Sequence, residues 1–467
     1  MYRDDLVKLW TAEGFIGSSD RGKDMEDVGL ECFNELASTS FLQLGGKVGK
    51  EFFGGKDYYL VHDLLYDLAE MAAGNDCFRI ENGYGWRGID QGREGSLREV
   101  PRDVRHLFVQ YYDEKLIIGK VLGLENLRTL IIYHVGWSPV EEKVIESICK
   151  RLKKLRVLAI AFGPVDTLIR KPDLCSVPES LRELKHLRYL AFCTIEECRV
   201  ILPSTLTKLY YLKLLDFGEC EKMEFPSTGL INLQHVLCGL EVTFPNVGRL
   251  LSLQTIPEFT VRNVKGYEVK QLRDLNKIRG TLWIKGLESV TSKEEALDAN
   301  LAAKEGLTEL CLIWAGGASC NQDVAAEVLE GLCPPVGLQT LRIKCYPGSR
   351  YPDWMHNGGP EDLQQLMSWD SPHLGRQPAP QLTFPHLRVL KLAYCRWDDL
   401  PGNIEQLTSL EKLRLFQCMN IRSLPALPPS LEKFSLTYCK DEFTKSCQTV
   451  GHENWEKLKH VPIKDFQ

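Results

Sequence analysis

The chain has 467 residues, 44% of them hydrophobic and 26% charged, so it can bury a large core and is longer than one ordinary domain. Its formal net charge of -6 provides no overall positive field of the kind that favours nucleic acid or an anionic membrane. No apolar stretch approaches the roughly 18 residues of a membrane-spanning helix, and the opening residues, MYRDDLVKLW, place charges where a secretory signal needs an apolar core. We therefore expect a protein of the cytoplasm, with the nucleus as the alternative compartment, and no integral membrane segment.

The cysteines are scattered over the whole chain rather than clustered. Three of them, Cys395, Cys418 and Cys439, occupy the same position of a repeating pattern, which is typical of small buried hydrophobic side chains in a reducing compartment. No asparagine begins an Asn-x-Ser/Thr glycosylation acceptor, and this argues against a secreted leucine-rich receptor. Both features favour an intracellular protein.

Residues 1–80 have the pattern of a small α+β domain. The segment MEDVGLECFNELA places apolar residues on one face of a helix; these are Val28, Cys32, Phe33 and Leu36. The stretch FLQL, a loop rich in glycine and lysine, and YYLVH then predict a hairpin with a long wing. A further helix has an apolar side made of Leu64, Leu65, Leu68 and Ala72. This order predicts a winged-helix domain, and we expect residues 81–100, which contain NGYGWRGIDQGREGS, to be a linker.

Residues 101–467 repeat one phrase: a leucine, two variable residues, a second leucine, one variable residue and an apolar residue. It occurs as LRTLII, LRVLAI, LRYLAF, LKLLDF, LQTLRI, LRVLKL, LEKLRL and LEKFSL, mostly at intervals near the roughly 20–29 residues of leucine-rich repeats. The alternation predicts short strands whose leucines point inward, and stacked strands build a parallel sheet over a continuous core. The predicted fold is an α/β leucine-rich-repeat solenoid with a curved parallel sheet, preceded by a small α+β winged-helix domain.

Two kinds of segment interrupt the repeats. Proline-bearing returns such as SVPES, ILPST and DLPGN prevent long helices between strands. Residues 357–383, around the proline-rich stretch SWDSPHLGRQPAPQLTFP, are expected to be an irregular insertion rather than another repeat.

His62 and Asp63 lie in YLVHDLLYDLAEMA, where the second wing strand gives way to a helix. Asp63 immediately precedes Leu64 and is well placed to cap the helix by accepting free backbone N–H groups of its first turn. His62 lies beside the same helix N-terminus, where unpaired N–H groups and the helix dipole attract anions. His62 therefore either packs against the helix or contacts a phosphate.

The same stretch resembles the Met-His-Asp region of plant intracellular nucleotide-binding leucine-rich-repeat (NB-ARC–LRR) disease resistance proteins, with Val61 in place of the methionine. DLVKLWTAEGFI and EDVGLECFNELASTSFLQ resemble the segments upstream of that region, and ENWEKLKHVPIKDF resembles the usual ending of cereal and related members. The resemblance covers nearly the whole chain. It implies the C-terminal part of such a protein, with residues 1–80 as part of the winged-helix regulatory subdomain.

In that family the histidine contacts the β-phosphate of bound ADP and helps to hold the receptor in its off state. The resemblance thus implies a nucleotide contact for His62 and a switch role for the His62-Asp63 pair. The sequence has no G-x-x-x-x-G-K-[ST] phosphate loop, so we expect no cofactor in this chain, although complete family members bind ADP or ATP. We also expect the chain to begin after the nucleotide-binding core and to lack an N-terminal signalling domain.

Residues between the leucines of each phrase face the concave side of the predicted sheet. In the last repeats they form a basic patch edged with aromatic rings, and the candidate contact residues are Lys391, Tyr394, Lys412, Arg414, Phe416, Lys433 and Tyr438. Aromatic and arginine side chains anchor protein interfaces, so the patch suits an acidic protein partner or acidic loop. The alternative is an ordinary solvated face.

Earlier repeats present small apolar residues instead, among them Ala159, Ala161 and Ala191. Small apolar side chains on a face open to solvent indicate that something covers it. We expect an intramolecular contact there, with the winged-helix domain or the nucleotide-binding module as the cover.

The sequence lacks a His-Glu-x-x-His helix, a Gly-x-Ser-x-Gly turn, a kinase loop set and a Cys-x-x-Cys metal pair. We therefore expect neither enzyme activity nor a metal site. The expected role is in plant innate immunity, where the repeats recognise a pathogen effector or a guarded host protein and the winged helix is part of an ADP/ATP-gated switch. The alternative is a nucleotide-independent adaptor or decoy that binds an effector or a sister receptor. DNA binding would require a basic recognition helix, whereas MEDVGLECFNELA is acidic, so we expect no nucleic acid partner.

Overall fold

The computed structural model describes residues 2–17, 25–48, 56–80, 99–110, 112–135, 140–162, 174–194, 199–218, 220, 222–225, 229–238, 241–315, 321–348, 350–357, 359–369, 381–395 and 397–467. The chain forms two compact units, Met1–Glu241 and Val242–Gln467. The first unit contains a small α+β domain and a seven-stranded parallel sheet, and the second contains a nine-stranded parallel sheet.

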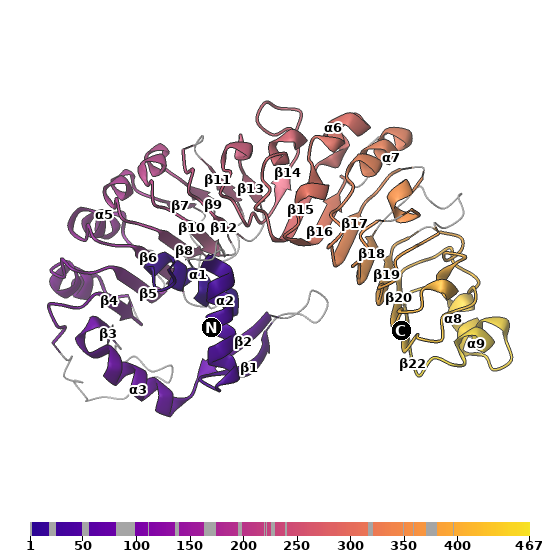
Figure 1. Cartoon of the computed structure of the whole chain (residues 1–467), viewed down its shortest axis with the longest axis horizontal. Helices are drawn as coiled ribbons and strands as arrows, with labels where there is room; N and C mark the ends of the chain where they lie inside the picture. The colour runs from indigo at the N-terminus through magenta and orange to yellow at the C-terminus, as the bar shows by residue number, and fades with distance from the viewer. Residues whose placement is uncertain are drawn as a thin grey trace. The chain divides into compact units, whose positions relative to one another are not determined.

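The N-terminal domain, residues 2–73, consists of two helices, a hairpin and a third helix (Figure 1). Its elements are α1 Arg3–Glu13, α2 Met25–Ser38, β1 Leu42–Val48, β2 Lys56–Val61 and α3 Asp63–Ala73. The two strands pair antiparallel, with an irregularity of register between Leu44 and Gly46. This order of helices and hairpin is the one that the sequence predicts for a winged-helix domain.

The core of this domain is formed by Val7, Phe33 and Leu42. Gly29 allows α1 and α2 to approach closely, because a Cβ atom at that position would lie 2.6 Å from Val7 Cγ1. Cys32, predicted on the apolar face of α2, is exposed, since the face that packs on α1 runs through Gly29 and Phe33 instead.

The seven-stranded sheet of the first unit is built largely by the leucine phrases (Figure 1). Its strands, in spatial order, are β12 His235–Leu237, β10 Leu214–Gly218, β8 Tyr189–Thr194, β6 Val157–Phe162, β5 Thr129–Val135, β4 His106–Val109 and β3 Cys77–Ile80. Leu130, Leu158 and Leu190 are in register across three strands and are fully buried, as the inward-pointing leucines of the phrase require.

This sheet begins earlier than predicted. β3 pairs in parallel with β4, with Cys77 opposite His106, so Cys77–Ile80 belongs to the leucine-rich-repeat sheet. The predicted end of the winged-helix domain at residue 80 is wrong for this reason, because CFRI lacks the leucines of the phrase and could not be recognised by them. Residues 81–98 of the predicted linker lie outside the described residues.

The returns between strands lie on one side of the first unit's large sheet (Figure 1), and we call the opposite side its open face. The returns include α4 Glu114–Leu116, α5 Glu142–Arg151 and a second parallel sheet that contains β7 Leu174–Ser176, β9 Arg199–Ile201 and β11 Lys222–Glu224. The strand β13 Glu241–Thr243 falls where the first unit ends in the sequence and the second begins. Pro178 and Pro203 each precede a short 3-10 helix, which agrees with the prediction that proline keeps these returns short.

The second unit repeats the same construction. Its strands, in spatial order, are β14 Phe259–Thr260, β15 Gly280–Lys285, β16 Leu307–Ile313, β17 Thr340–Lys344, β18 Gln365–Trp369, β19 Val389–Ala393, β20 Lys412–Phe416, β21 Lys433–Thr437 and β22 Ile463–Phe466. Its helices are α6 Lys293–Leu297, α7 Gln322–Gly331, α8 Asp441–Gln448 and α9 Glu453–Leu458. Leu390, Leu413 and Phe434 are in register and fully buried, so apolar layers like those of the first sheet form this core.

β18 lies inside the segment predicted as an irregular insertion, residues 357–383. It pairs in parallel with β17 on one side and β19 on the other, so LQQLMS is a repeat phrase and the insertion prediction is wrong for this strand. Buried Ser368 stands where the phrase expects an apolar residue, and this hid the repeat. Residues 370–380 lie outside the described residues.

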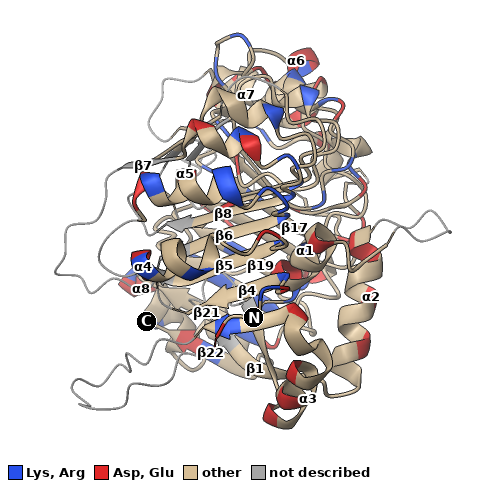
Figure 2. Ribbon diagram, turned by 90° about the vertical axis from the view of Figure 1, so that its left-hand side faces the viewer, with Lys and Arg blue, Asp and Glu red and all other residues tan. Residues whose placement is uncertain are grey.

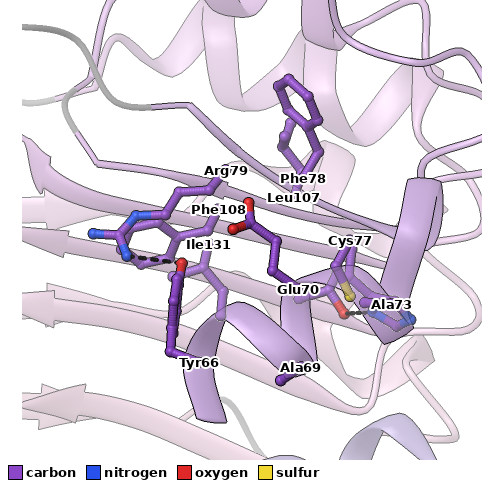
Figure 3. Close-up of a pocket in the computed structure, with 12 residues that line it drawn as sticks. Tyr66, Ala69, Glu70, Ala73, Cys77, Phe78, Arg79, Leu107, Phe108 and Ile131 are labelled. Carbon is purple, nitrogen blue, oxygen red and sulfur yellow. Dashed lines mark hydrogen bonds between the residues drawn. The ribbon is translucent and has the colours of Figure 1, made fainter. Parts of the chain in front are cut away.

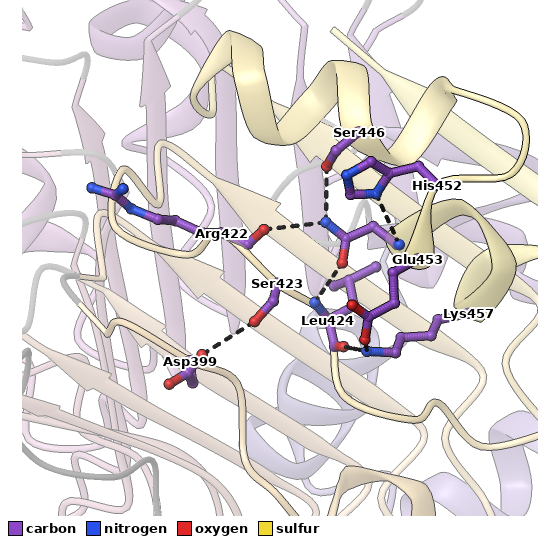
Figure 4. A network of polar contacts seen from close by, with 9 residues as sticks. Asp399, Arg422, Ser423, Leu424, Ser446, His452, Glu453 and Lys457 are labelled. Carbon is purple, nitrogen blue, oxygen red and sulfur yellow. Dashed lines mark hydrogen bonds and ion pairs between the residues drawn. The ribbon is translucent and has the colours of Figure 1, made fainter.

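A polar network around Asn454 joins α9 to the loop between β20 and β21 (Figure 4). The buried amide accepts a hydrogen bond at Oδ1 from the Leu424 N–H (2.9 Å), and its Nδ2 donates to the Arg422 carbonyl (3.1 Å) and to Ser446 Oγ (2.8 Å). Lys457 Nζ donates to the Leu424 carbonyl at 2.6 Å. These bonds satisfy buried backbone groups at the end of the sheet, so the Asn454 network closes the last repeat.

The recurring cysteines each lie two residues after the end of one of the last three phrase strands, β19, β20 and β21. Each is buried and its thiol donates to a carbonyl of the preceding repeat: Cys395 to Ser368 (3.7 Å), Cys418 to Leu392 (3.5 Å) and Cys439 to Leu415 (3.7 Å). The prediction that they are small buried side chains is confirmed.

Candidate functional site

His62 caps helix α3, and Asp63 is the first residue of that helix. The His62 backbone is extended, and its ring Nδ1 accepts a hydrogen bond from the Leu64 N–H at 3.2 Å. The prediction that Asp63 is the cap is therefore wrong by one residue: its carboxylate stands in the first turn, where the helix dipole favours negative charge. Around His62, the described residues place one helix N-terminus, and its Leu64 N–H is already bound by the His62 ring.

Helix α3 has no buried residue. Two leucines of its predicted apolar side are open to solvent, with 74% of Leu64 and 55% of Leu68 exposed, whereas Leu65 is half-buried. Met71, which was not predicted on that side, is 77% exposed. The helix also carries acidic side chains and no lysine or arginine (Figure 2). Open apolar surface of this size is typical of a segment that packs against another part of a larger protein or assembly.

The other side of α3 borders a cavity of about 500 Å³ whose remaining walls are β3, β4 and β5 (Figure 3). The walls are mainly apolar, and Arg79 lies along one of them. Its Nη1 donates to Tyr66 Oη at 3.3 Å, and its guanidinium carbon lies 5.2 Å from the centroid of the Phe108 ring. His106 and Thr129 also line the cavity, so it adjoins the contact between the N-terminal domain and the sheet.

Helix α1 lies on the open face of the first sheet and packs against β6. Arg156, just before β6, donates from Nη1 to the Glu13 carbonyl at 2.8 Å, and Arg188, just before β8, donates to the Ala12 carbonyl at 3.4 Å. The last carbonyl groups of a helix have no partners within it and carry the negative end of its dipole, so the two guanidinium groups satisfy both needs. Gly14 ends α1 with φ of 86°, and a Cβ atom there would lie 3.1 Å from Arg188 Nη1. Glycine therefore provides both the turn and the room for this contact.

The Glu13 carboxylate is buried at this end of α1, with 4% of the residue exposed. Its Oε1 accepts a hydrogen bond from Thr129 Oγ1 and lies 3.8 Å from His106 Nδ1, whereas Oε2 has no hydrogen-bond partner among the described residues. Burial lowers the pKa of His106, and the Glu13 carboxylate opposes that shift. This polar cluster fixes the end of α1 over β4 and β5.

The opposite end of the contact lies at β10 and β12. Glu26, at the start of α2, pairs with His235 of β12, and both side chains are largely buried. Burial raises the pKa of Asp216 on β10, and the Asp5 carboxylate of α1 raises it further. The N-terminal domain thus spans the open face from β4 to β12, and at each end a buried glutamate meets a histidine.

The predicted surface of small apolar residues lies on the strands that α1 crosses. Ala159 and Ala191 are opposite each other on β6 and β8; Ala191 is fully buried and Ala159 is half-buried. The side chain of Ala161 lies outside the described residues. Because methyl groups project least from a strand, a helix can approach these two strands closely.

The basic residues predicted in the last repeats come together on β19, β20 and β21. Lys391 is opposite Arg414, and Lys412 is opposite Lys433; all four are half-buried. Burial lowers the pKa of Lys391, and the positive charge of Arg414 adds to the shift. We call these four residues the basic cluster.

The predicted aromatic residues continue toward the C-terminal ends of the same strands. Tyr394, Phe416 and Tyr438 are joined there by Trp369 of β18, with ring centroids 5.2 Å apart for Trp369 and Tyr394, 5.3 Å for Tyr394 and Phe416, and 5.7 Å for Phe416 and Tyr438. We call these four rings the aromatic row. The structure therefore brings every predicted residue of this patch onto one continuous surface.

Sequence reasoning missed several residues of both sites. Trp369 was overlooked because β18 was assigned to an insertion. Arg156 and Arg188 carried a usable signal, since LRVLAI and LRYLAF share an arginine directly after the first leucine. No pattern marks Glu13 or His106 as partners, because their meeting depends on how the N-terminal domain docks on the sheet.

Among the described residues, no helix combines the length and apolar character needed to cross a membrane. Within the same ranges, no group of three or more His, Cys, Asp or Glu side chains is arranged to hold a metal ion.

Two family models match the chain. The model for the winged helix domain of disease resistance proteins matches residues 1–69, and the model for R13L1/DRL21 leucine-rich repeats matches residues 269–395. The two matches fall on the N-terminal domain and on the second unit's sheet.

Relatives in plants include disease resistance proteins that match most of the chain. RPP13-like protein 1 of Arabidopsis thaliana is 29% identical over 485 residues, which cover 100% of this chain and 40% of the relative. RGA4 of Solanum bulbocastanum is 27% identical over 463 residues, which cover 94% of this chain and 41% of the relative. The chain thus spans about two fifths of the length of these relatives.

Among solved structures, a leucine-rich-repeat protein of Leptospira interrogans, LIC12759, is similar with a TM-score of 0.46 and 17% identity, covering 78% of this chain and 90% of that one.

The chain has the winged-helix domain and the leucine-rich repeats of plant disease resistance proteins.

Proposed function

We propose, from the organisation that this chain shares with plant disease resistance proteins, that it serves in plant defence as a regulated, non-enzymatic recognition protein of the cytoplasm or nucleus. The repeats supply the surface for a pathogen effector, or for a host protein that an effector modifies. The N-terminal domain stays docked on the first sheet until recognition occurs.

The observation that carries this proposal is the polar contact at the end of α1. Arg156 and Arg188 hold its last carbonyl groups, and Glu13 is buried against β4 and β5. Buried polar contacts are satisfied in one arrangement only, so such an interface is either fully made or released. This property suits a restraint that recognition removes.

The restraint in this chain is assigned to protein contacts and not to nucleotide. His62 Nδ1 is engaged by the Leu64 N–H, and the sequence has no phosphate loop. A single contact at a helix N-terminus is a weak substitute for a phosphate cradle.

The defence role is tested by disrupting the gene in the plant that encodes this chain and challenging the plants with a panel of pathogen isolates. Loss of resistance to at least one isolate, restored by the intact gene, supports the proposal. Unchanged resistance across the panel, together with no binding of the purified chain to any effector of those isolates, contradicts it.

A second candidate function is a nucleotide-independent adaptor or decoy that binds an effector or a sister receptor. The solvent-exposed side of α3, formed by Leu64, Leu68 and Met71, favours this alternative, because it offers apolar surface to a second protein. The Arg156→Ala/Arg188→Ala variant separates the two candidates, because only the first requires a docked N-terminal domain that restrains the chain. Defence signalling without a pathogen supports the restraint, and unchanged signalling with intact binding of the partner supports the adaptor. Both candidates predict no heat on titration with ADP in a calorimeter, and micromolar ADP binding contradicts both.

A further inference from the structure

The basic cluster consists of two staggered pairs on three strands, with Lys412 and Arg414 on the middle one. Lys391 faces Arg414 and Lys412 faces Lys433 across neighbouring strands, which places each pair on strands about 4.8 Å apart. Along β20, Lys412 and Arg414 are two residues apart and share one face, so their backbones are separated by about 6.6 Å. Phe416 follows at the same interval on the same face.

The four cations lack the carboxylate partners that other cations of this sheet possess. Arg342 Nε lies 2.8 Å from Glu309 Oε1, and Lys285 pairs with Glu258. In the described part of the chain, none of Lys391, Lys412, Arg414 and Lys433 forms an ion pair with an acidic side chain, and Arg414 Nε is buried without a hydrogen-bond partner. Like charges this close repel one another, and a buried unpaired donor is costly. The arrangement therefore favours contact with negative groups of a partner.

The aromatic row defines the other half of the surface. Tyr438 is 62% exposed and Tyr394 is 37% exposed, so these rings offer apolar area beside the cations. The Phe416 ring packs at 65° against Tyr394 and at 86° against Tyr438. This packing joins the rings into one continuous apolar strip beside the cations.

We propose that β19, β20 and β21 bind an extended acidic segment of a partner protein, in which two carboxylates and one apolar side chain are each separated by one residue. The carboxylates contact the basic cluster, with Arg414 and Lys412 of the middle strand at its centre, and the apolar side chain lies on the aromatic row. An extended chain repeats every two residues at about 6.6 Å, which matches the spacing of Lys412, Arg414 and Phe416 along β20. This inference rests on the proposed recognition function and names the chemistry of the partner.

The test uses fluorescence anisotropy with the purified full chain and labelled peptides built on Glu-Ser-Glu-Ser-Phe. We expect this peptide to bind with an affinity that falls as salt rises. Two control peptides should each bind at least about tenfold more weakly. One is Gln-Ser-Gln-Ser-Phe, and the other has the composition of the first peptide with its two glutamates adjacent. Equal binding of all three peptides, or no binding of the first at millimolar concentration, overturns the inference.

Matched variants locate the site. Lys412→Gln/Arg414→Gln should lower peptide affinity about tenfold, whereas Lys270→Gln/Lys459→Gln, with the same change of charge at exposed positions of the same unit, should leave it unchanged. If the first variant fails to fold, Lys433→Gln alone provides the comparison. The assignment is overturned if the two double variants have equal effects. It is also overturned if an oligothymidylate with the same charge as the acidic peptide binds more tightly than that peptide. Failure of peptide binding in a chain that still confers resistance overturns this inference and leaves the proposed function standing.

Discussion

Arg156 and Arg188 are predicted to hold the N-terminal domain on the first sheet. The Arg156 guanidinium donates to the Glu13 carbonyl at 2.8 Å, and Arg188 donates to the Ala12 carbonyl at 3.4 Å. A hydrogen bond from a charged donor contributes about 1.5–3 kcal/mol. Both side chains are only half-buried and the second bond is long, so we assign about 2 kcal/mol to the pair.

Replacing both residues, Arg156→Ala/Arg188→Ala, should therefore raise the population of the undocked N-terminal domain about 30-fold. Ala191 provides a reporter, because it is fully buried on β8 beneath this contact. An Ala191→Cys substitution places a thiol there, and its rate of alkylation is proportional to the undocked population when closing is faster than the reaction. Peptide mapping by mass spectrometry measures that rate separately from the rates of the native cysteines.

We expect the reporter thiol to react about 30-fold faster in the Arg156→Ala/Arg188→Ala background than in the unmodified one. Arg182→Ala, at an exposed position on the return side, serves as the control and should not change the rate. Buried Cys418 in the second unit should react equally slowly in all variants. Identical reporter rates in all backgrounds would refute the docking role of the two arginines.

Three further outcomes follow from the structure. Burial lowers the pKa of His106. Between this folded pKa and the unfolded value of about 6.5, the unfolded chain binds more protons than the folded one, so stability rises with pH. The urea midpoint of unfolding should therefore fall on going from pH 7.5 to 5.5, and it should fall by less in His106→Gln; an equal fall in both proteins contradicts this. Asn454→Ala removes the hydrogen bonds to backbone groups in Figure 4. It should destabilise the last repeats by about 2–5 kcal/mol, measured as the free energy of opening by hydrogen exchange. Asn357→Ala, at an exposed position, should cost less than about 0.5 kcal/mol, and equal effects of the two variants count against the network. Exposed Cys77 should be alkylated in the native chain while Cys418 is protected, and rapid labelling of Cys418 under native conditions rules out its burial.

The repeat architecture could be predicted because a strand phrase with buried leucines recurs. Where the phrase is degenerate the prediction failed: Ser368 occupies an apolar position in β18, and CFRI of β3 has no phrase at all. Both strands are recognised only through the neighbours that pair with them. Sequence periodicity therefore predicts a repeat only when the residues of that repeat carry the pattern. Repeats without the pattern are recognised by the strands that pair with them in three dimensions.

The two surfaces differ in how far sequence could predict them. The basic cluster and the aromatic row follow from strand alternation, because residues two apart share a face and neighbouring repeats are in register. The contact of α1 with the sheet depends on a docking geometry that no local pattern encodes. The small side chains of Ala159 and Ala191 indicated a covered face, while the buried partners Glu13 and His106 became visible only in three dimensions.

At His62 the sequence motif predicts where the helix begins but not which side chain caps it. The helix start was predicted correctly to within one residue, but the cap is the His62 ring and not the Asp63 carboxylate. An imidazole Nδ1 and a carboxylate can both accept from the first turn, so the sequence alone could not choose between them.

The most direct test is a chimera in which this chain replaces the corresponding segment of RGA4 from Solanum bulbocastanum. Cell death is scored after transient expression of the chimera in leaves. We expect the chimera to be silent. Arg156→Ala/Arg188→Ala should make it active without any effector, whereas Lys412→Gln/Arg414→Gln should leave it silent. Immunoblots confirm equal amounts of each protein. A chimera that stays silent with both arginines replaced, although the reporter thiol shows that the N-terminal domain has undocked, would contradict the claim that this contact restrains the receptor.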